Sequence, residues 1–426
     1  MGGRRRIDDA LDGAAGGGLL DRRALLGGGL LSAGLAAAGA QAAETGETGA
    51  LPPWTTTPGR PMSGYGQPSR AVAAVKRLVV APPGRPGTGA SRTPHQSLEG
   101  TITPNGLHFE RHHNGVPDID PARHELLIHG LVRRPIALSL DRLLRYPMET
   151  HVRFIECSGN SRDLTADKPV QAAAGSLNGL MSCSEWTGVR LALLLDEAGV
   201  EPGARWLLAE GADAASLSRS VPLAKAMDDA VVALFQNGEP IRPEQGFPMR
   251  LLLPGYEGNI NIKWLHRLKL TRGPTYTRDE TSKYSDLLPD DRAELFTLEM
   301  AVKSIITRPS FGLDMAGPGL YEISGLAWSG QGRVARVEVS ADGGRSWAEA
   351  ALTGPVLPKA LTRFRAPWRW DGAPAVLMSR ATDEGGQRQP SRSAWLAKYA
   401  PGQGYHFNGV QSWAVDAAGR VSNVHA

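Results

Sequence analysis

The chain has 426 residues, which is enough for two domains of ordinary size and a substantial core. Apolar residues make up 41% of the sequence and charged residues 21%, proportions typical of a soluble globular protein and not of a disordered or fibrous one. The formal net charge is +4, and the sequence contains neither a block of like charge nor an RNA-binding motif. This balance argues against nucleic acid as a partner and favours an anionic small substrate or an acidic partner.

The N-terminal stretch has the features of an export signal. Arg22 and Arg23 precede a weakly apolar run rich in Gly and Ala, and residues 40–42 read Ala-Gln-Ala, the pattern of a cleavage site. We expect residues 1–42 to be a twin-arginine signal peptide and the mature protein to work in the periplasm. The apolar run is too short and glycine-rich for a membrane span. The twin-arginine route carries folded proteins, often already loaded with a cofactor. The alternative is a disordered Arg- and Gly-rich tail.

The next part of the chain predicts an arm followed by a mixed domain. Residues 43–95 are rich in Pro, Gly, Ser and Thr, so they predict an extended arm and not a core. From 96 to 290 strands and short helices alternate too irregularly for a βαβ repeat, which favours an α+β fold. Strands are predicted at 124–132, 151–157, 204–211, 230–241, 247–255 and 262–270, and helices at 138–147 and 187–199, the second capped by Thr187 and ended by Gly199.

Closely spaced strands dominate from 295 to 400. They are predicted at 319–330, 333–352, 362–370 and 375–389, with Asp-Gly-Gly and Glu-Gly-Gly turns between them. This spacing is typical of a small immunoglobulin-like β-sandwich. The last 26 residues, from 401 to 426, have an irregular pattern and are expected to fold back onto a neighbour.

The sequence contains only two cysteines, Cys157 and Cys183. In an exported protein they could form a disulfide. Cys157 instead stands at the start of a Ser-Gly-Asn turn with Arg162 close by, which suits a thiolate metal ligand beside a bound oxyanion. A nucleophile is the third possibility, although no histidine stands near it in the sequence. Cys183 is most simply a buried small apolar residue.

A histidine cluster occupies residues 108–120. His108 and His112 would share one face of a helix and could bind zinc, but an Asn-Gly pair and a proline directly after them break any helix. Arg111 and the histidines suit an anionic group instead, and a solvated polar loop is the remaining alternative. Other motifs are absent: no Walker pattern, H-E-x-x-H or G-x-S-x-G occurs. The C-x-x-C-H motif is also missing, so this chain carries no c-type haem of its own.

Several of these stretches together resemble the molybdenum subunits of the sulfite oxidase family. "HFERHHNGVPDIDP" resembles the segment that lines the pterin, and "FIECSGNSR" matches the C-x-G-N-x-R loop whose cysteine ligates molybdenum. "EQGFPMRLLLPG" and "NINIKWLHRL" match the family's G-F-P-x-R and K-W-L segments, and "GLAWSGQGRVARVEVSADGGRSW" matches the start of its immunoglobulin-like dimerisation domain. The resemblance covers the chain from about residue 100 to its end.

The resemblance assigns roles to particular residues. Cys157 would ligate molybdenum, and Arg111, Arg162 and Tyr284 would surround the substrate anion as catalytic residues. Gln245 and Asn261 stand where animal sulfite oxidases have histidines. The residues that would hold the molybdopterin are Phe109, Glu110, Arg111, His112, His113, Cys157, Asp213, Gln245, Arg250, Asn261, Ile262 and Lys263.

Two departures from the family pattern bear on the substrate. The pocket tryptophan has no counterpart in "DKPVQAAAGSLNG", and the last pocket arginine is replaced within "YHFNGVQSW", near His406 or Asn408. With the signal and the missing haem motif, the chain looks most like the molybdenum subunits of bacterial sulfane dehydrogenases. That resemblance implies a Mo-molybdopterin cofactor and a sulfane sulfur on a carrier-protein cysteine as substrate. It also implies a separate c-type cytochrome as electron acceptor, in a homodimer or a heterotetramer.

Three other functions are compatible with the sequence. A periplasmic sulfite dehydrogenase using free sulfite is the nearest alternative. A methionine sulfoxide reductase of the same family is a weaker one, because the C-terminal sandwich resembles that of the oxidases. A cofactor-free β-sandwich binding protein with a Cys157–Cys183 disulfide belongs to a different class and would show neither free thiols nor molybdenum.

Overall fold

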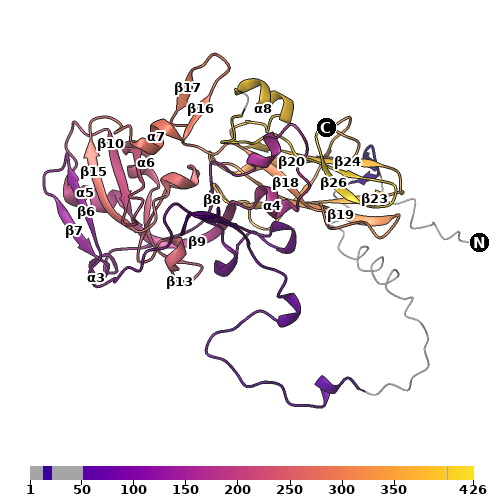
Figure 1. Ribbon diagram of the computed structural model, residues 1–426, viewed down its shortest axis with the longest axis horizontal. Coiled ribbons are helices and arrows are strands. Elements are labelled where there is room, and N and C mark those ends of the chain that lie inside the picture. Colours follow the sequence, from indigo (N-terminus) through magenta and orange to yellow (C-terminus); the bar gives the residue numbers. More distant parts are fainter. Residues whose placement is uncertain (1–12, 22–50, 401) are drawn as a thin grey trace, which may run out of the picture.

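The computed structural model describes residues 13–21, 51–400 and 402–426 (Figure 1). The twin-arginine pair and the predicted cleavage site at 40–42 lie outside these residues. Within the described ranges no helix is long and apolar enough to cross a membrane. An α+β domain and a β-sandwich lie side by side, and strands β8 (Glu149–Glu156) and β9 (Met181–Arg190) lie near their junction.

The first domain contains two sheets around one apolar core. One sheet has the order β11-β10-β15-β6-β7, with β15 and β6 parallel, and the other has the order β13-β12-β9-β8, with β14 joined to β12. Helices α5 (Leu191–Ala198) and α6 (Leu223–Asp228) contribute to the same buried cluster. The strands are β6 Glu125–Gly130, β7 Ile136–Ser139, β10 Trp206–Gly211, β11 Ser218–Pro222, β12 Val231–Gln236, β13 Glu239–Pro240, β14 Arg250–Leu252 and β15 Leu265–Thr271.

The predicted helix cap at Thr187 is wrong. Thr187 lies inside β9, where it pairs with Thr150 of β8 and Phe235 of β12, and α5 begins only at Leu191. Strand pairing on both sides of β9 outweighs a local capping preference. Gly199 does end the helix, in the left-handed conformation with φ of 71°. The other predicted helix, 138–147, is reduced to α3 (Leu140–Leu143).

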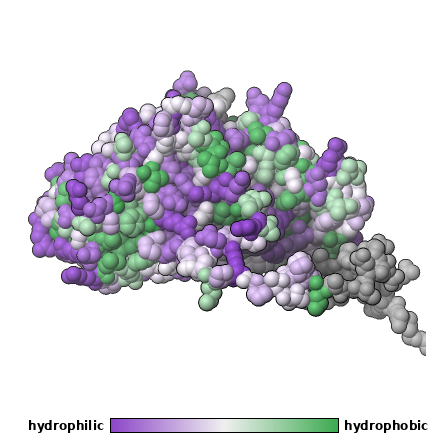
Figure 2. All heavy atoms as spheres, turned by 60° about the horizontal axis from the view of Figure 1, so that its bottom comes forward, coloured by the Kyte–Doolittle hydropathy of each residue, from purple (hydrophilic) through white to green (hydrophobic). Residues whose placement is uncertain are grey.

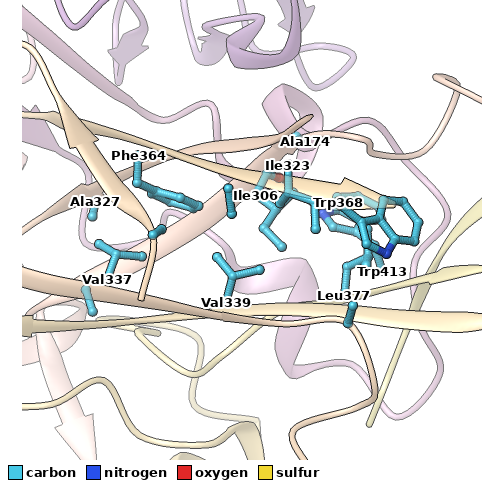
Figure 3. Close-up of a cluster of buried hydrophobic side chains, with 14 of the residues drawn as sticks. Ala174, Ile306, Ile323, Ala327, Val337, Val339, Phe364, Trp368, Leu377 and Trp413 are labelled. Carbon is cyan, nitrogen blue, oxygen red and sulfur yellow. The ribbon is translucent and has the colours of Figure 1, made fainter. Parts of the chain in front are cut away.

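The second domain is a sandwich of two sheets. In the described residues one sheet has the order β1-β2-β23-β19-β18, with β22 joined to β23, and the other has the order β21-β20-β24-β25-β26. Figure 3 shows Phe364, Trp368 and Trp413 between them, and all three side chains are fully buried. The strands are β1 Gly13–Ala15, β2 Leu19–Leu20, β18 Lys303–Arg308, β19 Gly319–Trp328, β20 Val334–Ser340, β21 Ala348–Glu349, β22 Ala351–Thr353, β23 Thr362–Trp370, β24 Ala375–Asp383, β25 Ser412–Val415 and β26 Val421–Val424.

The C-terminal residues are more regular than the sequence predicts. Strands β25 and β26 extend the sheet of β24, so the expectation of an irregular tail from 401 onward is wrong. The alternation that marks them is only four residues long in each strand, and Trp413 supplies the packing that fixes the first. The sandwich therefore continues almost to the end of the chain.

The Pro- and Gly-rich arm has two parts. From residue 51 to about 76 it carries only the short turns η2 (Pro53–Thr55) and η3 (Arg70–Val72) and lies largely exposed beside the body (Figure 1). It then forms a small sheet in which β3 (Leu78–Val80) and β4 (Gly89–Arg92) pair with β5 (Glu110–His112). His112 thus lies on a strand and not on a helix, and His108 and His113 lie on either side of that strand in the sequence.

A few short elements lie outside the main sheets of the two domains. The hairpin β16–β17 and helix α7 lie above the first domain in Figure 1, and α8 lies over the sandwich. On the face drawn in Figure 2, hydrophobic residues form separate groups between hydrophilic ones. These elements are α4 Ala174–Asn178, α7 Arg278–Ser282, β16 Ser285–Leu287, β17 Ala293–Leu295 and α8 Arg392–Lys398.

Candidate active site

The centre of the site is the loop of residues 157–161, which we call the cysteine loop. It leaves the end of β8, and the Cys157 N–H donates to Leu180 O at 2.9 Å. Asn160 closes the turn: its N–H donates to Cys157 O at 2.8 Å and its side chain donates to Glu156 Oε1 at 2.9 Å. Ser161 then takes the left-handed conformation, with φ of 65°. Local hydrogen bonds thus fix the backbone at the cysteine.

The sandwich domain holds this loop from behind. Glu156, directly before the cysteine, accepts from Lys303 Nζ at 3.2 Å and from Trp328 Nε1 at 2.7 Å. Lys303 also donates to Ser161 Oγ at 2.6 Å. The side chains of Glu156 and Lys303 are both only 2% exposed, so the charges lie in a low-dielectric interior where each depends on the other.

Two further segments contact the loop. His406 donates its backbone N–H to Ser158 O at 2.8 Å, and Asn259 donates its side-chain amide to Ser158 Oγ at 3.2 Å. Gly258 passes so close that a Cβ there would lie 2.8 Å from Glu156 O. Three parts of the chain distant in sequence therefore converge on the cysteine.

A cavity beside Cys157 encloses about 730 Å³ of space, counting its opening to solvent. Every residue expected to hold the cofactor lines it, as does Tyr284. Asn259 and Trp264, which the sequence analysis missed, flank the 261–263 motif and could have been found by extending it. His108 was considered only for zinc. The lining residues are His108, Phe109, Glu110, Arg111, His112, His113, Ile155, Cys157, Gly211, Asp213, Leu217, Gln245, Arg250, Gly258, Asn259, Asn261, Ile262, Lys263, Trp264 and Tyr284.

Two cations in this cavity, the buried Arg250 and the half-buried Lys263, form no ion pair with a carboxylate among the described residues. Arg250 is 3% exposed and donates only to uncharged oxygens, among them Asn261 O at 3.0 Å. Burial lowers its pKa to about 9. Burial, with the nearby charge of Arg250, also lowers the pKa of Lys263 to about 7. Such uncompensated cations are expected where an anionic group binds.

The lining residues fit a pterin cofactor carrying an anionic phosphate. Arg250 Nε, His108 Nε2 and Asn259 Oδ1 are buried without a hydrogen-bond partner, so both donors and acceptors face the cavity region unsatisfied. Burial lowers the pKa of His108 to about 3 and that of His113 to about 4, which leaves both imidazoles neutral. Arg250 and Lys263 would hold the anionic part, and the neutral polar groups would bind a heterocycle.

Gln245 and Asn261 brace the cavity wall. Gln245 Nε2 donates to Phe109 O at 2.9 Å, which joins the wall to the segment before β5. Asn261 accepts from Leu253 N at 2.7 Å and donates to Glu257 O at 3.0 Å. Because both amides are used inside the protein, they support the cavity through its backbone.

A wider mouth, with about 1480 Å³ of space including open solvent, leads to the same cysteine. Arg111 and Arg162 both line it, so the structure places both substrate-binding candidates beside Cys157. Tyr284 borders the mouth as well, and its hydroxyl lies 3.4 Å from His113 Nε2. Arg85 and Thr88 of the arm also line the mouth, and the arm's composition gave no signal of this.

Tyr405 takes the mouth position that was expected near His406 or Asn408. Its ring lies 5.8 Å from that of Tyr284 and borders the mouth. His406 points away, with Nδ1 at 2.9 Å from Asp286 and Nε2 at 3.1 Å from Glu257, and Asn408 donates to Val302 O. The residue at the mouth is therefore Tyr405, and not His406 or Asn408 as the sequence predicts.

Both cysteines are free thiols, so the disulfide alternative is wrong. Cys183 is fully buried in an apolar cluster, whereas Cys157 is partly exposed to the cavity. Burial raises the pKa of the Cys157 thiol, an effect that Gly159 N–H and the charge of Arg111 oppose. The charge of Arg111 therefore favours the thiolate. A free cysteine at the edge of a cation-lined cavity, in a two-domain fold of this kind, is what a molybdopterin oxidoreductase would require.

Comparisons with known proteins agree. The model of the oxidoreductase molybdopterin binding domain matches residues 113–278, and that of the Mo-co oxidoreductase dimerisation domain matches residues 294–410. Sulfite oxidase of Gallus gallus is 31% identical over 318 residues, 69% of each chain. Mitochondrial sulfite oxidase of Homo sapiens is 34% identical over 301 residues, 66% of this chain and 54% of that protein.

The crystal structure of the sulfane dehydrogenase SoxCD from Paracoccus pantotrophus superposes with a TM-score of 0.86 at 44% identity, covering 88% of this chain and 97% of that one. The chain spans about half the length of the mammalian sulfite oxidases that it matches, 52% to 54%. It belongs to the sulfite oxidase family of molybdenum enzymes, and Mo-molybdopterin is the cofactor that this assignment implies.

Removing one partner of the buried Glu156–Lys303 ion pair should destabilise the folded protein. Replacing Lys303 by Met leaves the Glu156 carboxylate buried without its cation, so we expect a loss of roughly 3–5 kcal/mol of stability. The double variant Lys303→Met/Glu156→Gln removes both charges and should recover much of it. The control Lys398→Met alters a side chain that is 59% exposed and should change stability little. Denaturant unfolding measures all three, and a Lys303→Met loss no larger than the control would contradict the assignment.

The His406 network predicts a defined pH dependence. Hydrogen bonds and charges of Asp286 and Glu257 outweigh burial and raise the pKa of His406 to about 10. The folded protein therefore keeps a proton that the unfolded chain releases above about 6.5, so the stabilisation is complete below pH 6.5 and disappears as the pH rises through 10. The stability difference between wild type and His406→Gln should shrink between pH 6.5 and 10. A difference that stays constant would show that His406 is neutral.

Proposed function

We propose that the protein oxidises sulfane sulfur bound to a cysteine of a carrier protein and passes the electrons to a c-type cytochrome subunit in the periplasm. The observation that carries the proposal is the wide mouth in front of Cys157. Gly159, Ala214 and Ala215 line it without bulk, so an extended peptide segment has room to enter. The 44% identity to a sulfane dehydrogenase supports the same substrate class.

The cations at the mouth would bind the sulfur-bearing anion. Arg111 and Arg162 border the space next to the cysteine, and guanidinium groups bind oxyanions through paired hydrogen bonds. Arg111 Nη1 lies near backbone carbonyls of Gly89 and His112, which limits its movement and aims it. Arg111, held by these carbonyls, and the exposed Arg162 would together orient the sulfur toward Cys157.

The tyrosines would act as neutral hydrogen-bond donors. Burial is the main cause that raises the pKa values of both Tyr284 and Tyr405. Both hydroxyls therefore remain protonated at neutral pH and can donate to a substrate oxygen or relay a proton. The Arg219 guanidinium lies 4.8 Å from the Tyr284 ring centroid and holds it in place.

Cys157 would hold the molybdenum. The thiol gives up its proton when a metal binds, which offsets the pKa rise caused by burial. When bound, the cofactor supplies the two-electron oxidation chemistry with oxygen drawn from water. The chain has only two cysteines and no haem-attachment motif, which supports a separate electron acceptor. The matched dimerisation domain supports a homodimer.

Oxidation of free sulfite is the second candidate, because several curated relatives are sulfite oxidases. The two candidate substrates differ in size, because free sulfite needs only the inner end of the mouth whereas a carrier protein needs its full width. Turnover of the purified enzyme with sulfite and with a carrier-bound sulfane, using cytochrome c reduction as the readout, separates the two. Higher kcat/KM with the carrier supports the proposal, and activity with sulfite alone rejects it.

Removing one mouth cation should weaken turnover. We expect Arg162→Ala to lower kcat/KM by about 10- to 100-fold, because a charged donor to the substrate anion is lost. The matched control Arg336→Ala removes an exposed arginine from strand β20, far along the sandwich, and should have no effect. Steady-state kinetics with both substrates provides the comparison. Unchanged kinetics in Arg162→Ala would remove this residue from the site.

A further inference from the structure

The first described residues of the chain occupy a groove on the sandwich. Strands β1 and β2 form a hairpin, and Leu19 of β2 pairs with Trp368 of β23. Leu19 is fully buried within the sandwich core cluster, and Leu20 is 8% exposed. The hairpin, drawn in indigo, lies at the sandwich end of the molecule in Figure 1. This segment lies within the predicted signal peptide of residues 1–42.

The groove selects for glycine at three successive positions. A Cβ on Gly16 would lie 2.6 Å from Asp342 Oδ2, one on Gly17 would lie 2.8 Å from Ala341 O, and one on Gly18 would lie 1.9 Å from Arg369 O. Gly17 and Gly18 also have φ of 69° and 85°, which other residues rarely adopt. The Gly-Gly-Gly-Leu-Leu sequence is therefore matched to this surface.

Directed hydrogen bonds fix the same segment. Trp368 Nε1 donates to Gly17 O at 2.7 Å, and the Arg369 N–H donates to Gly18 O at 2.8 Å. On the other wall, the Gly16 N–H donates to Ser346 Oγ at 2.8 Å. Trp368 and Arg369 belong to β23, and Ser346 belongs to the turn between β20 and β21, so the complete groove exists only when this domain has folded.

We propose that the groove bounded by β23 and the 341–346 turn is a docking surface for the chain's own leader, and that docking at Gly13–Leu20 competes with capture of the leader by the export receptor. The twin-arginine pair begins two residues after Leu20 in the sequence, and such signals are read by a receptor. If the receptor binds only the undocked segment, its apparent affinity for the precursor falls in proportion to the fraction of molecules in which the segment is undocked. Docking would therefore make recognition of the leader depend on whether the sandwich has folded. This holds whatever substrate the enzyme uses.

The first test places substitutions in the leader of the full-length precursor. Gly18→Val should expel the hairpin, because its side chain would meet the Arg369 backbone, whereas Gly13→Ala has open space, with Leu19 O at 4.0 Å as its nearest neighbour. We expect protease cleavage after Leu19 and leader removal in cells to be at least about fivefold faster in Gly18→Val. Gly13→Ala should behave as wild type.

The second test leaves the leader unchanged. Trp368→Phe and Ser346→Ala each delete one bond to the segment from the groove side. Ser346 lies near the surface, so folding should persist in Ser346→Ala, which is the decisive variant; Trp368 is fully buried, so denaturant unfolding of Trp368→Phe accompanies its cleavage assay. Both should speed protease cleavage and leader removal in the same direction as Gly18→Val. An effect confined to Gly18→Val would mean that the leader sequence alone matters, and would overturn the proposal. Retention of residues 13–20 in the exported protein would also overturn it, since the hairpin would then be a permanent strand.

Discussion

The arrangement of the site depends on one buried ion pair between the two domains. Glu156 ends β8 immediately before Cys157, and its partner Lys303 belongs to the first strand of the sandwich after the linker. Because neither charge is solvated, the pair tolerates little separation, and the sandwich thereby fixes where β8 ends. Trp328 and Ser161 complete the same network. The second domain thus helps to build the site.

The charge distribution of the cavity explains which ligand it fits. The buried Arg250 and the half-buried Lys263 form no ion pair with a carboxylate of the described residues, and burial lowers the pKa values of three nearby histidines, which keeps them neutral. Such cations are costly without a counter-charge, and a bound anionic ligand would offset their charge. The cofactor cavity is narrow, while the mouth is wide, and Gly159, Ala214 and Ala215 line part of it. One site therefore combines tight cofactor binding with access for a bulky substrate.

The sequence predicted much of this, and its failures have physical causes. The cysteine loop and the 261–263 segment are short local motifs, so their residues were found. Thr187 was misread because strand pairing on both sides of β9 overrides a local cap. Tyr405 was missed because its position depends on how the tail folds against Ser158, and the arm's Arg85 because proline-rich composition says nothing about contacts. The sequence predicts a leader over residues 1–42, but it gave no sign that residues 13–20 form a hairpin that packs against β23.

The central claim is that Cys157 binds molybdenum, and X-ray absorption of the purified protein tests it most directly. Wild type should contain about one molybdenum per chain with a thiolate in its ligand shell. Cys157→Ser should show one sulfur ligand fewer, and the control Cys183→Ser, at a buried residue outside the cavity, should match wild type. A protein without molybdenum, or a sulfur shell unchanged by Cys157→Ser, would contradict the claim.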